Sequence, residues 1–131
     1  MAKDIWVLIA GAGKPELLAR TLNSVATTVK PPGYRGVFVA ENGPRCGIEN
    51  VVREFGRQHA VRHLYVAAGN KSHALNCALA QLDEGLVVMT DDDVRLDANV
   101  LCAYAEAASG REAGEFYGGP VLIHAAHGLP P

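Results

Sequence analysis

The sequence has 131 residues, the size of one domain with a substantial buried core. Its 12 Lys and Arg are nearly balanced by 14 Asp and Glu, and the two signs are interspersed along the chain. A nucleic-acid-binding footprint or a membrane-surface patch would need clustered basic residues, so we expect no nucleic-acid partner. No apolar stretch approaches the ~20 residues of a membrane-spanning helix, so no transmembrane segment is expected in this chain.

The cysteines Cys46, Cys77 and Cys102 are odd in number and have no CxxC spacing. This usage is typical of a reducing compartment, and we expect a cytoplasmic protein. The apolar residues 5–10 superficially resemble the core of a signal peptide. The run is short and Asp4 interrupts the basic leader, so a first strand is the better interpretation.

The chain alternates apolar runs with amphipathic segments. The apolar runs predict five strands, at residues 5–10, 37–40, 61–66, 86–90 and 115–117. Between them, apolar residues recur at helical spacing and predict four helices. Such alternation predicts an α/β fold with a mostly parallel sheet, helices on both faces and right-handed crossovers. We expect residues 1–131 to form a single domain.

Particular residues mark the ends of these helices. Pro15 suits the first turn of the first helix, which is expected to continue to Val29 before two prolines stop it. Residues 48–55 form a short amphipathic helix that Gly56 closes. We expect Ser72 to cap the third helix, and Asp97 can cap the fourth, because side-chain oxygens accept hydrogen bonds from free N–H groups at helix starts.

The apolar run at residues 86–90 breaks abruptly into three consecutive carboxylates at residues 91–93. Ligands of open α/β sheets bind outside the carboxyl ends of the strands, and clustered acids repel one another unless a cation or hydrogen-bond donors compensate them. Mg²⁺ or Mn²⁺ on a diphosphate meets that need, because such ions bind through one or two carboxylates plus phosphate oxygens. The alternative is a solvated acidic loop that merely caps the following helix.

Four polar clusters are expected to meet at the same edge of the sheet. They are residues 11–14, Glu41 with Asn42, residues 70–72 and residues 91–93. Glycines let the backbone approach a ligand closely, and a helix start offers free N–H groups. With Lys71 as a mobile positive charge, the clusters could hold a nucleoside diphosphate, with Glu41 and Asn42 reading a base or ribose.

Two phosphate-binding motifs share features with the same residues. The turn at residues 11–16 begins as GxGxxG but places Glu16 where close helix packing wants glycine or alanine, which counts against a dinucleotide-binding fold. Glu41 does fall near the place of a ribose-binding acid, so that fold remains an alternative. A P-loop is excluded, because Leu8 stands at the leading glycine and Pro15 at the metal-binding Ser or Thr.

Five segments of the chain form a recognisable set: residues 15–24, 41–43, 69–76, 90–94 and 118–120. Their most specific part is residues 71–76 followed by the three aspartates. Together they resemble the nucleotide-sugar-binding half of family 2 glycosyltransferases. The resemblance runs through nearly the whole chain. It implies the GT-A fold, which is Rossmann-like, and a transferase that uses a nucleoside-diphosphate sugar and a divalent metal, Mg or Mn, usually with inversion at the anomeric carbon.

The resemblance also implies roles for individual residues. Glu41 would contact the base, Asp91 the ribose or base region, and Asp93 the metal, as the last member of the D-x-D motif. Lys71 would lie beside the nucleotide. The complete expected nucleotide-sugar site is Ala10, Gly11, Glu41, Asn42, Lys71, Asp91 and Asp92.

The sequence departs from the family in two places. The first turn reads Ala-Gly-Ala-Gly at residues 10–13, where the family usually has Pro-Thr-Tyr-Asn. The acceptor half, with the acidic catalytic base, would begin after about residue 120, so no catalytic residue is assigned and the acceptor stays unknown. We expect a truncated glycosyltransferase; the alternative is a non-catalytic nucleotide-binding or interaction module.

Two further expectations concern the surfaces of such a partial fold. A sheet that lacks its second half would leave an edge or face uncovered, which could lead to self-association. His124 and His127 form an HxxH pair, but alanine, glycine and proline neighbours give it no regular frame, so a tail is a better interpretation than a metal site.

Overall fold

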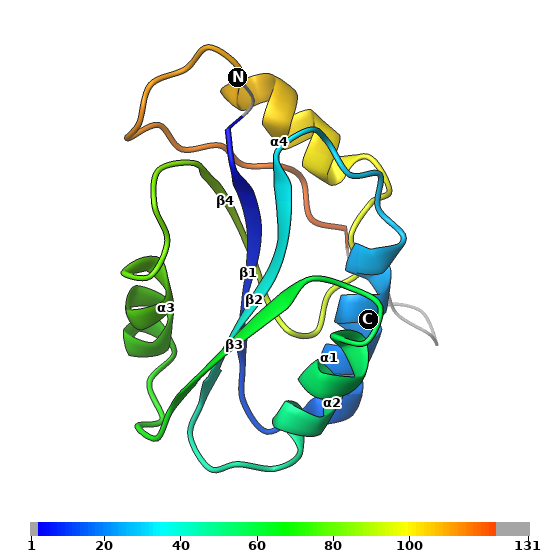
Figure 1. Ribbon diagram of the computed structural model, residues 1–131, viewed down its shortest axis with the longest axis vertical. Coiled ribbons are helices and arrows are strands. Elements are labelled where there is room, and N and C mark those ends of the chain that lie inside the picture. Colours follow the sequence, from blue (N-terminus) through cyan, green and yellow to red (C-terminus); the bar gives the residue numbers. More distant parts are fainter. Residues whose placement is uncertain (1–2, 123–131) are drawn as a thin grey trace, which may run out of the picture.

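The computed structural model describes residues 3–122, in which four strands alternate with four helices (Figure 1). The elements are β1 (Ile5–Gly11), α1 (Pro15–Ala26), β2 (Tyr34–Asn42), α2 (Ile48–Phe55), β3 (Val61–Val66), α3 (Lys71–Leu79), β4 (Leu86–Thr90) and α4 (Val100–Ala108). The strands form one parallel sheet in the order β3-β2-β1-β4. The predicted α/β fold with a parallel sheet is confirmed.

β1 is an inner strand of the sheet, and the chain adds strands on both sides of it. β2 and β3 are added on one side of β1, and the chain then crosses back to place β4 on the other side. At such a reversal the connections leave neighbouring strand ends in opposite directions and open a crevice at their carboxyl ends. The end of β1 and the end of β4 are therefore the expected walls of a ligand site.

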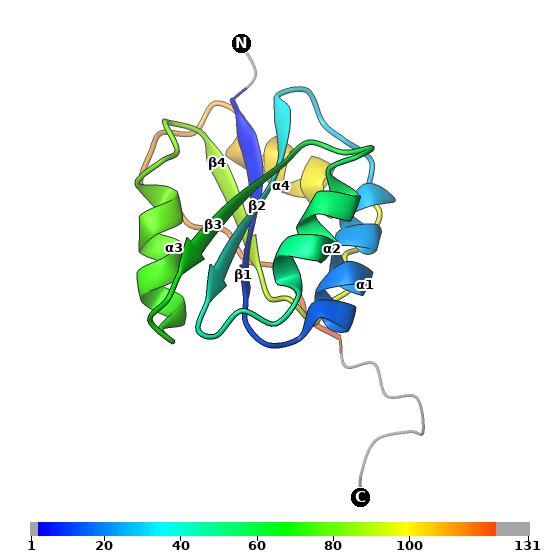
Figure 2. The ribbon, with the colours of Figure 1, turned by 60° about the horizontal axis from the view of Figure 1, so that its bottom comes forward.

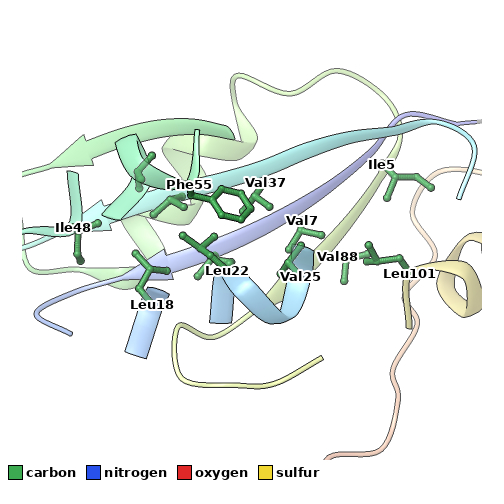
Figure 3. Close-up of a cluster of buried hydrophobic side chains, with 13 residues drawn as sticks. Ile5, Val7, Leu18, Leu22, Val25, Val37, Ile48, Phe55, Val88 and Leu101 are labelled. Carbon is green, nitrogen blue, oxygen red and sulfur yellow. The ribbon is translucent and has the colours of Figure 1, made fainter. Parts of the chain in front are cut away.

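Helices cover both faces of the sheet, as predicted. Figure 2 shows α3 on one side of the sheet and α1 and α2 on the other. The larger core lies under α1, α2 and α4, where alternate residues of the strands meet the apolar stripes of these helices (Figure 3). Its members include Val7, Ile9, Val37, Val39, Val88, Leu18, Leu22, Ile48 and Leu101.

The smaller core lies under α3, whose alanines allow a close approach to the sheet. Ala74 and Ala78 pack on Leu8 and Phe38. Met89 of β4 is paired in register with Leu8 and so belongs to the same face, but its side chain is 54% exposed. α3 thus covers β1, β2 and β3 more fully than β4.

The predicted fifth strand is wrong. Residues 115–117 follow an irregular path within the described chain and pair with no strand of the sheet. Phe116 is 97% exposed. A strand needs a neighbour for its backbone groups, and the short Glu-Phe-Tyr segment between Gly114 and Gly118 has nothing to hold it against the edge of the sheet.

Three expected helix ends also differ. α1 stops at Ala26 rather than Val29, because the N–H of Val29 leaves the helix to donate to the Ala98 carbonyl, at 2.8 Å, and the Lys30 ammonium takes over the Val25 carbonyl, at 2.7 Å. Positive side chains commonly satisfy the free carbonyls at helix ends in this way.

The caps of α3 and α4 differ from those expected. The cap of α3 is Asn70, not Ser72, and its side-chain oxygen accepts from the N–H of His73 at 3.0 Å. Asp97 forms a turn before α4 by accepting from the N–H of Asn99, at 3.0 Å, and the helix begins only at Val100.

None of the helices in residues 3–122 has the length and apolar character that a membrane span requires. His124 and His127 lie outside the described residues.

Candidate functional site

A hollow of about 290 Å³ lies at the carboxyl edge of the sheet. It joins the turn after β1, the end of β2, the start of α3 and the loop after β4. Its walls are formed by Ala10, Ala12, Lys14, Asn42, Lys71, Asp91, Asp92 and Asp93. The structure therefore brings together all the residues expected at the site except Gly11 and Glu41.

A second hollow of about 200 Å³ lies at the opposite edge of the sheet, near Trp6, Arg62 and Glu84. Both of its arginines are already engaged. The Arg62 guanidinium donates to Gln81 at 3.0 Å and lies over the rings of Trp6 and Phe38, and Arg35 pairs with Asp4 at 3.0 Å. The hollow at the carboxyl edge is the better candidate, because its charged groups converge at the strand reversal between β1 and β4.

Lys71 and Asp91 form an ion pair across the mouth of this hollow. The Lys71 ammonium donates to Asp91 Oδ1 at 2.6 Å, and both side chains are more than half exposed. That hydrogen bond, followed by the negative charge of Asp91, raises the pKa of Lys71 above its ordinary value, and the charges of Asp92 and Asp93 add to the effect. Lys71 is therefore a permanent positive charge beside the three acids at neutral pH.

Asp92 links the acidic loop to the turn after β1. Its Oδ2 accepts from the backbone N–H of Ala12 at 3.4 Å. The next residue of that turn, Gly13, has a φ of 71°, a conformation that glycine adopts freely. The turn and the acidic loop thus form two sides of the same hollow.

Asp93 is exposed and, within the described part of the chain, makes no side-chain hydrogen bond. Residues 3–122 contain no group of three His, Cys, Asp or Glu side chains arranged to hold a metal by themselves. Mg²⁺ and Mn²⁺ do not need one, because they bind through one or two carboxylates and take their other ligands from phosphate and water. Asp93, together with Asp91 once it is released by Lys71, could supply those carboxylates.

Glu41 lies beneath the hollow rather than in its wall. Its side chain is 1% exposed, and Oε1 is 2.9 Å from Nε2 of His63 on β3. Oε2 is buried and has no hydrogen-bond partner among the described residues. The neighbouring Asn42 does line the hollow, and its Nδ2 donates to the carbonyl of Gly11 at 3.4 Å.

Gly11 lies beside the core rather than in the wall of the hollow. A Cβ at this position would lie 3.4 Å from Cδ1 of Ile48 and 3.9 Å from Cδ2 of Leu18. These are ordinary van der Waals distances, so the packing of α1 and α2 does not require glycine here. The glycine expected at the ligand thus faces the core under these two helices.

Two polar residues on the buried side of α1 escaped the sequence analysis. Thr21 and Ser24 hydrogen-bond to the backbone of residues 92–96, a segment that overlaps the end of the acidic run. Thr21 is completely buried between Leu18 and Val25 on the apolar stripe. A polar residue inside such a stripe indicates a buried hydrogen bond, because a buried hydroxyl group needs a partner.

No protein-family model matches the sequence, and no curated protein matches it. Solved structures do match. The mannosyltransferase PcManGT from Pyrobaculum calidifontis, in complex with GDP-Man and Mn²⁺, is similar with a TM-score of 0.74 and 21% identity, over 83% of this chain and 33% of that one. This chain has a GT-A-like fold.

A second protein gives the same result. The crystal structure of S. aureus TarS 1-349 is similar with a TM-score of 0.71 and 18% identity, over 80% of this chain and 32% of that one. The same TarS 1-349 in complex with UDP-GlcNAc has a TM-score of 0.72 and 18% identity, over 80% and 31% of the two chains. The present chain thus spans about a third of the length of these neighbours.

Proposed function

We propose that this chain is the donor-binding part of a family 2 glycosyltransferase, which binds a nucleoside-diphosphate sugar together with Mg²⁺ or Mn²⁺. The observation that carries this proposal is the convergence of Lys71 with Asp91, Asp92 and Asp93 in one hollow at the strand reversal. The structural neighbours support it, because one of them was solved with GDP-Man and Mn²⁺ and another with UDP-GlcNAc.

The chemistry assigned to each group follows from its charge and place. A divalent cation, when bound, neutralises the charge that develops on the leaving diphosphate. Asp93 would be its first protein ligand. Asp91, which the resemblance places at the ribose or base, would supply a second carboxylate if the Lys71 ammonium turned from it to the diphosphate oxygens. Asn42, whose amide reaches the hollow, hydrogen-bonds to the nucleoside. Transfer also needs a base for the acceptor hydroxyl, and we assign that role to no residue of 3–122.

The alternatives receive less support from the site. A dinucleotide-binding fold would use the acid at the end of β2 for a ribose, but Glu41 is enclosed and held by His63. A nucleotide-binding module without transfer activity is favoured by one observation, the ion pair that occupies Asp91. Release of nucleoside diphosphate from UDP-GlcNAc or GDP-mannose would exclude that second candidate.

The test is calorimetric titration of UDP and of GDP into the chain, with and without Mn²⁺. We expect Mn²⁺ to strengthen binding, and Asp93→Asn to weaken the Mn²⁺-dependent binding about tenfold or more, because a charge-assisted contact contributes roughly 1.5–3 kcal/mol. Asp83→Asn is the matched control, because Asp83 is an exposed carboxylate at the other hollow. Binding that is indifferent to both Mn²⁺ and Asp93→Asn would contradict the proposal.

A further inference from the structure

The acidic loop after β4 is attached to α1 by a buried threonine. Thr21 Oγ1 lies 2.9 Å from the carbonyl oxygen of Asp92 and 3.0 Å from that of Val94, and can donate its proton to either. The same oxygen accepts from the N–H of Val94 at 3.2 Å. One hydroxyl thus meets three backbone groups, all within or directly after the acidic run.

Ser24 continues this attachment one turn further along α1. Its Oγ accepts from the N–H of Leu96 at 3.1 Å and donates to the carbonyl of Thr21 at 2.8 Å. Residues three apart on a helix lie on the same face, so both hydroxyls face the same segment. They fix residues 92–96 at two points.

The backbone of this segment has few other partners. Residues 91–99 contain no helix or strand, although they follow a strand of the sheet directly. Partly buried N–H and C=O groups outside regular structure must find partners in side chains or water. The hydroxyls of α1 supply what a continuing strand would have supplied.

We propose that Thr21 is a positioning residue for the acidic loop. Its hydroxyl sets the backbone of residues 92–94, and thereby directs the carboxylates of Asp92 and Asp93 toward the hollow. The expected effect on the affinity for a metal-bound nucleotide rests on the proposed function. Its structural part, the attachment of the loop, can be tested without any ligand.

The segment directly after α1 offers a matched control. Thr28 is also buried, at 5% exposure, but its Oγ1 donates at 2.6 Å to the carbonyl of Val25 in α1. Thr21→Val and Thr28→Val therefore remove the same group from similar surroundings. Only Thr21→Val detaches the acidic loop.

The experiment compares Thr21→Val, Thr21→Ser and Thr28→Val in two measurements. The first is amide hydrogen exchange without ligand. Thr21→Val should speed exchange at the Val94 N–H about tenfold, the effect of losing one hydrogen bond, whereas Thr21→Ser and Thr28→Val should leave it close to wild type. The second is titration with UDP or GDP and Mn²⁺, in which Thr21→Val should weaken the Mn²⁺-dependent binding about tenfold and Thr21→Ser should restore it.

The possible outcomes separate this proposal from the proposed function. Unchanged exchange at Val94 in Thr21→Val overturns the positioning role, as does equal loss of binding in Thr21→Val and Thr28→Val. If the wild-type chain binds no nucleotide, the proposed function fails, and the exchange data alone decide the attachment. If Thr21→Val does not fold, Ser24→Ala replaces it, with faster exchange expected at Leu96 and unchanged exchange overturning the proposal.

Discussion

Oε1 of Glu41 lies 2.9 Å from Nε2 of His63, and the other oxygen of the same carboxyl group is buried without a hydrogen-bond partner in the described chain. The pair joins β2 to β3 on the face under α2. A proton must lie between the two atoms, since neither a bare carboxylate nor an unprotonated Nε2 can donate. Among residues 3–122, His63 therefore supplies the only hydrogen bond to the Glu41 carboxyl group.

Removing His63 should expose that dependence. His63→Leu leaves a buried carboxyl group without any partner, so we expect it to lower the free energy of unfolding by about 1–3 kcal/mol. His63→Gln can place a donor near the former Nε2 and should recover much of the loss. Glu54→Gln is the control, because Glu54 and Arg57 form an exposed ion pair whose loss should cost at most about 1 kcal/mol. Urea unfolding measures all three, and equal stability of His63→Leu and Glu54→Gln would show that the buried pair contributes little.

Lys71 is expected to weaken the binding of a metal ion alone and to strengthen the binding of a diphosphate. Lys71→Met releases Asp91 and removes a positive charge, so Mn²⁺ alone should bind about two- to fivefold more tightly, while UDP or GDP with Mn²⁺ should bind more weakly by a similar factor. Paramagnetic resonance of free Mn²⁺ gives the first affinity and calorimetry the second. Arg57→Met changes the net charge equally at an exposed position after α2 and should alter neither. A parallel fall of both affinities would contradict the assigned role of Lys71.

Tyr34 makes stability fall at high pH. Burial raises the pKa of its phenol from 10.0 to about 12. The folded state thus holds the proton more tightly than the unfolded state, so this contribution is complete below pH 10.0 and is lost as the pH rises toward about 12. Ultraviolet titration should show a late tyrosinate step that Tyr34→Phe removes. Absence of a late step from the wild-type chain would place the Tyr34 phenol in water instead.

The exposed side chain of Met89 is expected to support self-association. β4 forms the edge of the described sheet, and Met89 is 54% exposed on the face that α3 leaves open there. Sedimentation velocity should show an average mass that rises with concentration, and Met89→Lys should reduce the rise, because charges on an edge strand oppose pairing. Val29→Lys tests the specificity of the effect, because Val29 has the same exposure but lies after α1. A monomer at all concentrations would refute the expectation.

The sequence predicts the positions of the helices and strands better than the contacts between them. Apolar runs identify the first four strands, and their carboxyl ends locate the hollow. Residues 115–117 have a suitable composition for a strand but no neighbour, which composition cannot reveal. The burial of Glu41 depends on the pairing of β2 with β3, which brings His63 of β3 diagonally beside it. The contacts of Thr21 join segments far apart in the chain, and only the fold brings them together.

The order of the strands also has a consequence for how the chain folds. Residues 5–66 can form a three-stranded unit from successive neighbours, whereas β4 must return to pair with β1. Ala12 and Asp92, which meet in the hollow, are 80 residues apart in sequence. Contacts between such distant segments carry a large loop-closure entropy and tend to form late. The nucleotide binding proposed above would therefore begin only at the last stage of folding, and its onset would report that β4 has docked.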